Sequence, residues 1–409
     1  MKTSPEGPIR VLHIVSSMKR AGQETWLMHV LRRINREEFA FDFLVDVPYA
    51  CAYDEEILTR GAGIIRCLSH KMPWQYARNF HRLMQQHGPY HIIHSHTLFY
   101  SGFIMQLAAQ AYIPIRIAHS HNDTSFLDTR ANPLRHLYQQ YMRRLVQRYA
   151  THGLAASTIA GTSFFGPCWA MDPRWRIQYC GIDLTPFALQ DISREAVRSE
   201  FFFTSAHRVI GHVGRFDEQK NHAFLIDVFA AASRHLPELR LLLIGDGPFR
   251  PAIEHKVRVM GLAERVIFAG VRADVPQLMR YAIDLFVLPS LYEGLPLVMI
   301  EAQAAGCHCL ISDVLAAETD ILPERIHRLP LSAGVTAWAD ALLELHPQHN
   351  KQDDDRALAR VCQSAFNIDR SIETLLSFYH EALSQVEDIT KLRHDARSTL
   401  PPSGGTPCV

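Results

Sequence analysis

The feature that most constrains the fold is an alternation of short apolar runs with longer stretches of helical periodicity over most of the 409 residues. Apolar runs of this length, separated by helices, are typical of parallel strands buried on both faces of a sheet. The first half therefore predicts strands at residues 9–17, 41–47, 63–69, 91–97, 115–121, 153–157 and 176–182. Helices are expected between them, including 23–36, 74–87, 101–111 and 134–150.

The alternation stops over residues 183–208, which we interpret as a linker with a short helix. It resumes with runs at 208–215, 240–247, 265–270, 284–290, 308–313 and 325–330. Two such series predict two doubly wound α/β domains, residues 1–190 and 191–365. A further helix is expected over 366–388, and residues 389–409, which end in a Ser-, Pro- and Gly-rich stretch, are expected to be disordered.

Charge and composition narrow the classes of function. Lys plus Arg and Asp plus Glu are both 42, which argues against a nucleic-acid partner because phosphate-backbone binding needs a basic excess. No apolar run reaches the roughly 20 residues of a membrane span, and the N-terminus lacks a signal-peptide core, so we expect a cytoplasmic protein. No Cys-x-x-Cys pair is present, and Cys307 and Cys309 are expected near a buried strand rather than at zinc.

Ligands of parallel α/β sheets bind beyond the carboxyl ends of the strands, so the residues after each run are the candidates. In GRFDEQKNH, Arg215 and Lys220 flank a loop between a strand and a helix, and two cations there could hold a diphosphate. A solvated surface pair is the alternative. Gly245 follows the next strand in LIGDG, which lacks the Gly-x-Gly-x-x-Gly of dinucleotide enzymes, so hydride transfer is disfavoured.

Two carboxylates lie in FVLPSLYEGLPLVMIEAQAAG, residues 286–306. Glu293 is in the loop after a strand, and Glu301 is about two turns into a helix expected to begin near Pro296. Carboxylates accept strong hydrogen bonds from the adjacent hydroxyls of sugars and ribose. The residues around Glu301 carry no charge that could pair with it, and burying an unpaired charge is costly. We therefore interpret Glu301 as a functional group rather than as an ordinary exposed helix residue.

The first half contains two His-x-His pairs at expected strand ends, and alternate strand residues face the same side. The pairs are His94/His96 and His119/His121. Three interpretations are open for these histidines. They are ligands of a metal ion, core residues whose hydrogen bonds are satisfied, or groups of a functional site without a metal. A catalytic metal needs three or four ligands, and a metal site would leave the cations and glutamates of the second half unexplained. Gly22, at a loop-to-helix junction, is either a plain turn residue or lets a ligand approach backbone NH groups.

These motifs resemble a known family. GRFDEQKN, LIGDGP, VIFAG and PSLYEGLPLVMIEAQAAG look like the nucleotide-sugar domain of retaining GT-B glycosyltransferases of the GT4 family, the group 1 type. SSMKRAGQE, HIIHSHT and IRIAHSHN are similar to the acceptor domain of its bacterial exopolysaccharide and capsule branch. The resemblance spans roughly residues 9 to 386. It implies two Rossmann-like domains facing a cleft, an N-terminal one for the acceptor and a C-terminal one for the nucleotide sugar, with helix 366–388 returning toward the first.

The resemblance also implies roles for donor-side residues. Arg215 and Lys220 would bind the donor diphosphate, and Glu301 would hold the ribose. Glu293 would contact the transferred sugar, together with backbone NH groups near Gly294 and Leu295. Gly22, Gly245 and Gly270 would lie in loops around the donor.

For the reacting face of the sugar, the resemblance implies a histidine followed by Asp, Asn or Gly. His121, followed by Asn122, fits best, and His96, His119 and Asn122 are candidates on the acceptor side. The implied catalytic set is therefore His121, Arg215, Lys220 and Glu293, with no metal or other cofactor. The sequence departs from the family pattern at Ala21, where a second glycine is usual, and at His91, where Asp is common.

The activity implied is transfer of a sugar, with retention, from a nucleotide diphosphate sugar to a glycan or polyprenyl-linked acceptor, with UDP as the default nucleotide. The alternatives are a metal-dependent hydrolase, a non-catalytic nucleotide-sugar-binding protein and a nucleotide-sugar 2-epimerase. Residues 19–36 and 134–148 combine basic and apolar side chains at helical spacing, so we consider peripheral contact with the inner face of an anionic membrane, or ordinary packing on the sheet.

Overall fold

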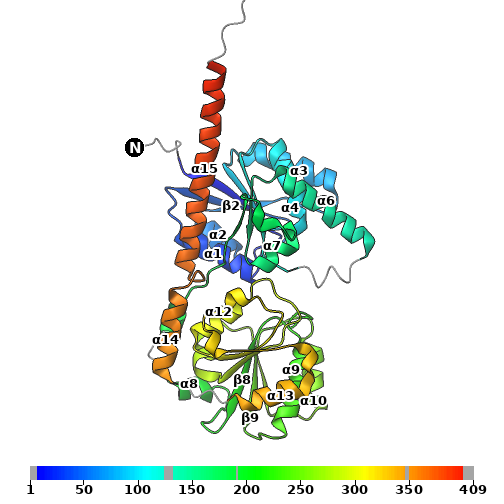
Figure 1. The fold of residues 1–409 in the computed structure, drawn as a ribbon, viewed down its shortest axis with the longest axis vertical. Coiled ribbons are helices and arrows are strands. Elements are labelled where there is room, and N and C mark those ends of the chain that lie inside the picture. The colour runs from blue at the N-terminus through cyan, green and yellow to red at the C-terminus, as the bar shows by residue number, and fades with distance from the viewer. Residues whose placement is uncertain (1–6, 124–131, 190–191, 346–349, 399–409) are drawn as a thin grey trace, which may run out of the picture.

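The protein forms two α/β units stacked one on the other, with a long C-terminal helix along the side of the first (Figure 1). The structure is a computed structural model, and it describes residues 7–123, 132–189, 192–345 and 350–398. Each of the thirteen apolar runs forms a strand, and all of the strand pairs are parallel. The prediction of two doubly wound sheets is thereby confirmed.

The first sheet has seven strands in the order β3-β2-β1-β4-β5-β6-β7. Their bounds are β1 Ile9–Ile14, β2 Phe39–Val45, β3 Gly63–Arg66, β4 Ile92–Ser95, β5 Ile115–Ser120, β6 His152–Ala155 and β7 Trp175–Ile177. Order reverses between β1 and β4, so the loops after these two strands diverge and leave room at the carboxyl edge.

Helices cover both faces of this sheet because successive strand residues alternate between the two sides. Val11 packs on one side with α1 (Gly22–Arg33), α2 (Asp54–Thr59) and α15 (Ile368–Ser398). Leu12 packs on the other with α3 (Pro73–His87), α4 (Ser101–Gln110), α6 (Pro133–Tyr149) and α7 (Thr158–Phe165). Continuous apolar runs in the sequence therefore reflect two hydrophobic cores rather than one.

The second sheet has six strands in the order β10-β9-β8-β11-β12-β13. The strands are β8 Arg208–Val213, β9 Leu239–Ile244, β10 Val266–Gly270, β11 Leu285–Leu288, β12 His308–Ser312 and β13 Ile326–Leu329. One face packs on α9 (His222–Ser233), α10 (Arg250–Val259) and α13 (Gly334–Glu344). The other packs on α12 (Leu297–Ala304), on α14 (Lys351–Cys362) and on a π-helical turn at Leu278–Ala282, which follows the short α11 (Val275–Gln277).

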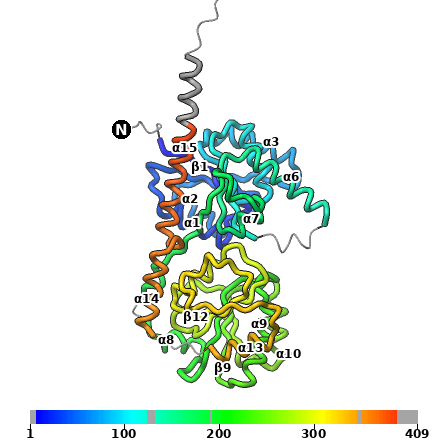
Figure 2. The backbone as a smooth tube through the Cα atoms, in the orientation of Figure 1, coloured from blue at the N-terminus to red at the C-terminus, as the bar shows by residue number. Residues whose placement is uncertain are grey.

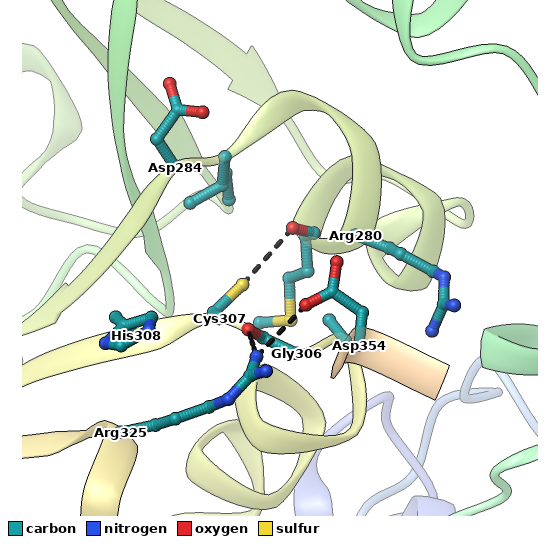
Figure 3. A pocket seen from close by; sticks show the side chains of 10 residues that line it. Arg280, Asp284, Gly306, Cys307, His308, Arg325 and Asp354 are labelled. Atoms are coloured by element: carbon teal, nitrogen blue, oxygen red, sulfur yellow. Dashed lines mark hydrogen bonds and ion pairs between the residues drawn. The ribbon is translucent and has the colours of Figure 1, made fainter. Parts of the chain in front are cut away.

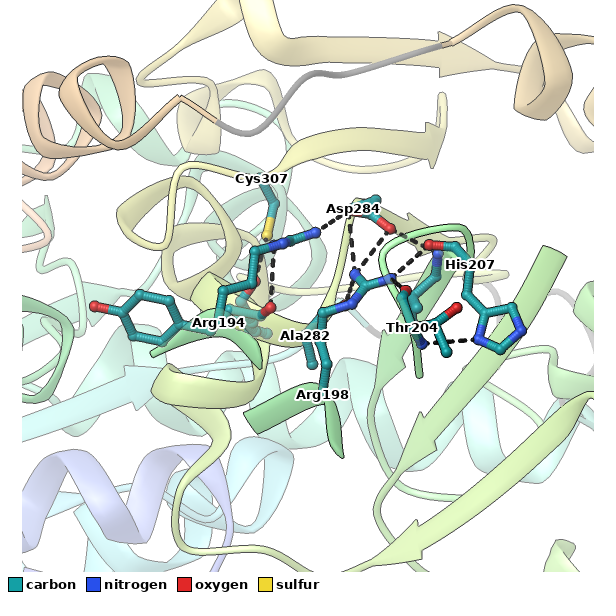
Figure 4. Close-up of polar contacts among 10 residues, drawn as sticks. Arg194, Arg198, Thr204, His207, Ala282, Asp284 and Cys307 are labelled. Carbon is teal, nitrogen blue, oxygen red and sulfur yellow. Dashed lines mark hydrogen bonds and ion pairs between the residues drawn. The ribbon is translucent and has the colours of Figure 1, made fainter. Parts of the chain in front are cut away.

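The expected linker helix, α8 (Arg194–Ser199), is fixed to the second sheet by charge (Figure 4). Arg194 and Arg198 both pair with Asp284, which immediately precedes β11. Asp284 also accepts a hydrogen bond from the Val209 NH at 2.7 Å, so one carboxylate joins the helix to two strands. The predicted domain boundary at residue 190 lies outside the described residues.

The C-terminal helices cross from the second unit to the first (Figure 2). Ala357 and Val361 of α14 belong to a core of the second sheet, whereas Leu375 and Tyr379 of α15 belong to a core of the first. The helix is longer than expected, because α15 continues to Ser398 where we expected disorder from residue 389. Residues 389–398 contain no glycine or proline to stop it, and residues 399–409 lie outside the described part. None of the helices over the described residues is both long and apolar enough to cross a membrane.

Candidate functional site

The carboxyl edges of the two sheets face each other, and the loops that follow the strands meet there. The Ser157 hydroxyl donates a hydrogen bond to the Gly294 carbonyl at 2.8 Å, and the Thr158 NH donates to Glu318 at 2.9 Å. A methyl group at Gly22 would lie 3.6 Å from the Leu297 side chain. The N-termini of α1 and α12 therefore approach the same gap, and both carry the positive end of a helix dipole.

A buried ion pair joins two of the predicted residues. The Lys220 Nζ atom lies 2.6 Å from Glu293 Oε1, and both side chains are largely buried. Glu293 also accepts hydrogen bonds from Gln219 and Ser290, each at 2.8 Å. The sequence places Lys220 and Glu293 in separate motifs and does not reveal that they pair. The pair holds the ammonium at the loop where a diphosphate is expected.

The predicted partner cation, Arg215, is exposed, and no ion pair of this side chain is found over the described ranges. Its charge acts on Lys19 of the first unit. A hydrogen bond with Tyr49 raises the pKa of Lys19, while the nearby Arg215 charge acts in the opposite direction. Lys19 was not among the predicted residues, although it lies in the same SSMKRAGQE motif as Gly22. Lys19, Arg215 and Lys220 therefore give the gap a positive lining suited to an anion.

Glycines let the loops of the second sheet pack closely. A Cβ atom at Gly245 would lie 2.1 Å from the Gly214 carbonyl oxygen, and the φ angle of Gly245 is +133°, so no other residue fits without strain. The Gly245 NH donates to the Gly270 carbonyl at 2.8 Å. Gly245 and Gly270, both predicted on the donor side, thus fix the adjacent ends of β9 and β10.

The second predicted carboxylate, Glu301, is on α12, which begins directly after Pro296 as expected. Burial raises the pKa of Glu301 to about 7, and the charge of Lys220 opposes that rise. No hydrogen bond or ion pair of the Glu301 side chain is found within the described residues. A carboxyl group with no side-chain partner, on the helix that lines the gap, can form hydrogen bonds with the hydroxyl groups of a ligand.

The histidine pairs form one buried cluster with a fifth histidine from β1. Its members are His13, His94, His96, His119 and His121, all at most 8% exposed. Nitrogen atoms of successive rings lie 3.1 Å apart for His13 and His96, 2.8 Å for His96 and His121, and 3.0 Å for His94 and His119. Each neutral imidazole can donate from one nitrogen and accept at the other, so the rings form hydrogen bonds with one another. Among the described residues, the buried Nε2 atoms of His13 and His119 have no hydrogen-bond partner.

Two groups outside the strands complete the histidine cluster. The Tyr379 hydroxyl lies 2.6 Å from His94 Nδ1, and the Cys180 thiol lies 3.5 Å from His121 Nδ1. Trp26 of α1 packs edge-on against His119. Burial lowers the pKa of His121 to about 3, so the imidazole is neutral near pH 7.

Two sets of three histidines in this cluster are close enough to hold a metal ion, namely His13, His94 and His96, and His96, His119 and His121. The rings lie beneath α1 and α15 and already contact one another, whereas a catalytic metal needs an open position for its substrate. The cluster therefore favours the interpretation of hydrogen-bonded core histidines over that of a hydrolase centre.

The predicted acceptor-side residues divide between the core and the surface. His96 and His119 are buried, and Asn122 is exposed at the gap. The backbone at His121 and Asn122 lies against Gly294, where a Cβ atom would come within 2.4 Å of the His121 carbonyl oxygen. The glycine thus allows the loop after β5 to touch the loop before α12. Whether these side chains contact a substrate stays a prediction.

The Cys-His-Cys motif lies elsewhere, at the amino edge of the second sheet (Figure 3). Cys307 donates to the Met279 carbonyl at 3.2 Å, and Arg325 bridges the Gly306 carbonyl and Asp354. The cavity beside them is only about 20 Å³. Cys309 is fully buried in β12, so the prediction of a buried strand here is confirmed.

Comparisons with known proteins agree with this geometry. Residues 207–347 match the family described as glycosyl transferases group 1. EpsF of Bacillus subtilis strain 168, whose name gives it as a glycosyltransferase, is 37% identical over 335 residues, covering 81% of this chain and 86% of EpsF.

A second relative and a solved structure extend the comparison. The Escherichia coli UDP-Gal:alpha-D-GlcNAc-diphosphoundecaprenol alpha-1,3-galactosyltransferase is 33% identical over 148 residues, covering 33% of this chain and 35% of its own. The structure of Anabaena HepE in complex with UDP and glucose has a TM-score of 0.73 and 19% identity over 91% of this chain and 99% of HepE, which shows a shared fold.

Proposed function

The chain belongs to the group 1 glycosyl transferases, and from this membership we propose that it moves a sugar from a nucleotide diphosphate sugar to a hydroxyl of a glycan or lipid-linked acceptor. UDP is the proposed nucleotide, supported by the structure of HepE in complex with UDP and glucose and by the Escherichia coli relative, whose name gives a UDP-Gal donor. Exopolysaccharide, capsule or lipopolysaccharide synthesis is the proposed setting, as the loops after β1, β4 and β5 resemble that branch.

The observation that carries this proposal is the gap between the sheets, where cations and carboxylates alternate. The Lys220 ammonium can contact a diphosphate as a compact point charge, and the planar Arg215 guanidinium can donate two parallel hydrogen bonds to it. Glu301 accepts from the ribose hydroxyls, and Glu293 accepts from the transferred sugar, beside backbone NH groups at Gly294 and Leu295. Before a donor binds, Glu293 holds Lys220 at 2.6 Å, so the ammonium is already oriented.

In the proposed reaction, the bond between the anomeric carbon and the diphosphate breaks, and negative charge develops on the leaving group. Lys220, Arg215 and the dipoles of α1 and α12 stabilise this charge in a partly desolvated gap. We propose that the acceptor hydroxyl attacks the face that the diphosphate leaves, which retains configuration, and that its proton passes to the leaving phosphate. In this proposal the protein's own cations stabilise the charge on the leaving diphosphate, so no metal ion is needed for that purpose.

A membrane-linked acceptor is supported by the surface of α6. Leu134 and Leu137 are 76% and 62% exposed, beside the exposed Arg135 and Arg144, and α6 contains no acidic residue. Such a face suits the interface of an anionic bilayer. The other candidate segment, α1, is an ordinary packed helix, because its apolar residues are buried against the sheet. The cysteines within the described residues are free thiols, which fits a reducing, cytoplasmic compartment.

The test is release of nucleotide diphosphate from a panel of UDP- and GDP-sugars in the presence of EDTA. We expect turnover of one donor, undiminished by the chelator. Donor binding without turnover would mean that the acceptor is missing from the assay and would leave the donor site supported. Failure of every donor to bind in calorimetry would contradict the proposal.

A further inference from the structure

A cavity of about 280 Å³ lies in the first unit, apart from the charged gap and the histidine cluster. It is at the carboxyl ends of β1, β2 and β4, on the face covered by α3, α4 and α6, whereas the histidines lie on the face covered by α1 and α15. Its volume approaches the lower limit of small-molecule sites, about 300 Å³. The cavity lies at the carboxyl edge of the first sheet, and the loop that contains Lys19 and leads to Gly22 lies at the same edge.

The lining of the cavity combines apolar, aromatic and polar groups. Ile14 and Leu44 form an apolar floor, and Tyr76, Tyr100 and Tyr138 form an aromatic side. The Tyr76 and Tyr100 rings meet edge to face, with centroids 5.3 Å apart. Sugar rings have apolar faces and a rim of hydroxyls, so they match walls of this mixed kind.

Two polar features of this lining could form hydrogen bonds with a ligand. The Tyr100 hydroxyl is buried and has no hydrogen-bond partner in the described part of the chain. Such a group normally finds one, because an unsatisfied buried hydroxyl costs free energy. Asp46 and His70 also line the cavity, with Asp46 Oδ2 3.4 Å from His70 Nδ1. Carboxylate and imidazole together can accept from and donate to neighbouring hydroxyls.

We propose that this cavity holds a saccharide ring of the acceptor, with Asp46, His70 and Tyr100 bonding its hydroxyls and Tyr138 stacking on it. The inference rests on the proposed function for its role, since a sugar placed here presents its free hydroxyls toward the donor gap. It assigns the acceptor to a different face of the sheet from that of His96 and His119.

The position of α6 links the cavity to the surface proposed for membrane contact. Tyr138 is 42% exposed at the cavity, one residue after the exposed Leu137. A lipid-linked acceptor could therefore place its sugar in the cavity while its lipid stays in the bilayer below α6. The saccharide then reaches the site from the membrane side without leaving the lipid.

The experiment is saturation-transfer NMR with the full chain and the methyl glycosides of glucose, galactose and N-acetylglucosamine. The variants are Asp46→Asn, Tyr100→Phe and Tyr138→Ala, of which the last removes the stacking ring. The matched control for loss of a hydroxyl is Tyr141→Phe, at an exposed residue of α6 that does not line the cavity. Calorimetry with UDP-sugars is run on every variant. Tyr100→Phe removes one oxygen atom and keeps the ring in place, so a loss of binding in this variant reports on the hydroxyl group.

We expect at least one glycoside to bind the wild type and Tyr141→Phe equally, and the three cavity variants to bind it roughly tenfold more weakly. Donor binding should be the same in all. A glycoside signal unchanged in the cavity variants, or no glycoside signal in a protein that binds donor, would overturn the inference. Glycoside binding that depends on the cavity, in a protein that binds no donor, would support the cavity and instead contradict the proposed function.

Discussion

Lys220 is the side chain on which the proposed donor site most depends. Glutamine at this position still donates a hydrogen bond to Glu293 but carries no charge to stabilise a leaving diphosphate. We therefore expect Lys220→Gln to lower the rate of nucleotide diphosphate release on the order of 10²-fold or more. Lys256→Gln is the control, since Lys256 pairs with Asp227 on the outer helices of the same unit. Equal rates in the two variants would remove Lys220 from the reaction.

Glu301 illustrates a residue that weakens the fold. Burial raises its pKa from 4.5 to about 7, so the folded state binds a proton that the unfolded state has lost between these values. Its contribution to the free energy of unfolding therefore falls as pH rises from 4.5 to 7, by up to about 3 kcal/mol. Urea unfolding should find Glu301→Gln more stable than wild type at pH 8 and similar at pH 4, with weaker donor binding at pH 8. A pH-independent difference would contradict this account.

At the scale of elements, α15 ties the end of the chain to the histidine cluster. The Tyr379 hydroxyl reaches His94, and the Trp26 NH donates to Ser371 at 3.0 Å. Tyr379→Phe leaves the buried His94 nitrogen without its partner, so we expect a loss of about 1–3 kcal/mol in the free energy of unfolding. Tyr141→Phe, on an exposed surface, should cost almost nothing in the same denaturation series. A similar small effect for both would show that the hydroxyl at position 379 is dispensable.

The exposed face of α6 makes a separate prediction about membranes. Wild-type protein should float with vesicles containing anionic phosphatidylglycerol, and less so as salt is raised, because both apolar burial and charge contribute. Leu134→Glu combined with Leu137→Glu should abolish flotation. Leu58→Glu on α2, also an exposed leucine at 58%, should not change it. Wild type that stays at the bottom of the gradient would rule out this contact.

The elements themselves were predictable from sequence because each core strand is a continuous apolar run and the helices between them have a clear period. The ends of the elements were less predictable: α15 extends ten residues beyond the predicted limit of 388, since residues 389–398 contain no glycine or proline to stop a helix. The contacts of the site were not predictable. Lys220 and Glu293 are 73 residues apart, and only the parallel order β8-β11 brings their loops together.

The same limit applies to the histidines. Their same-face spacing on β4 and β5 was evident, but His13 joins them only because β1 lies beside β4, with His13 opposite His94 in register. The sequence could not distinguish a metal site from a hydrogen-bonded stack, because both need imidazoles on one face. No sequence motif marks the cavity at Asp46 and Tyr138, since the residues that line it come from separate loops and helices.

At the scale of the whole molecule, the two sheets divide the work proposed for them. The second carries the cations, glutamates and close-packed glycine loops suited to a nucleotide diphosphate sugar, and the first carries the saccharide-sized cavity and the exposed apolar helix. Contacts such as Ser157 with Gly294 bring the two edges together, and α14 and α15 connect the units at the side. A reaction between two bound sugars needs this arrangement, because each unit can position one of them.

The most direct test of this account is the transfer of radiolabelled sugar from UDP-sugars into lipid-extractable material of bacterial membranes, with EDTA present. The account predicts incorporation from one donor by the wild type and by Lys256→Gln, and almost none by Lys220→Gln. No incorporation from any UDP- or GDP-sugar by a folded protein, or equal incorporation by Lys220→Gln, would contradict its central claim that these residues carry a sugar transfer.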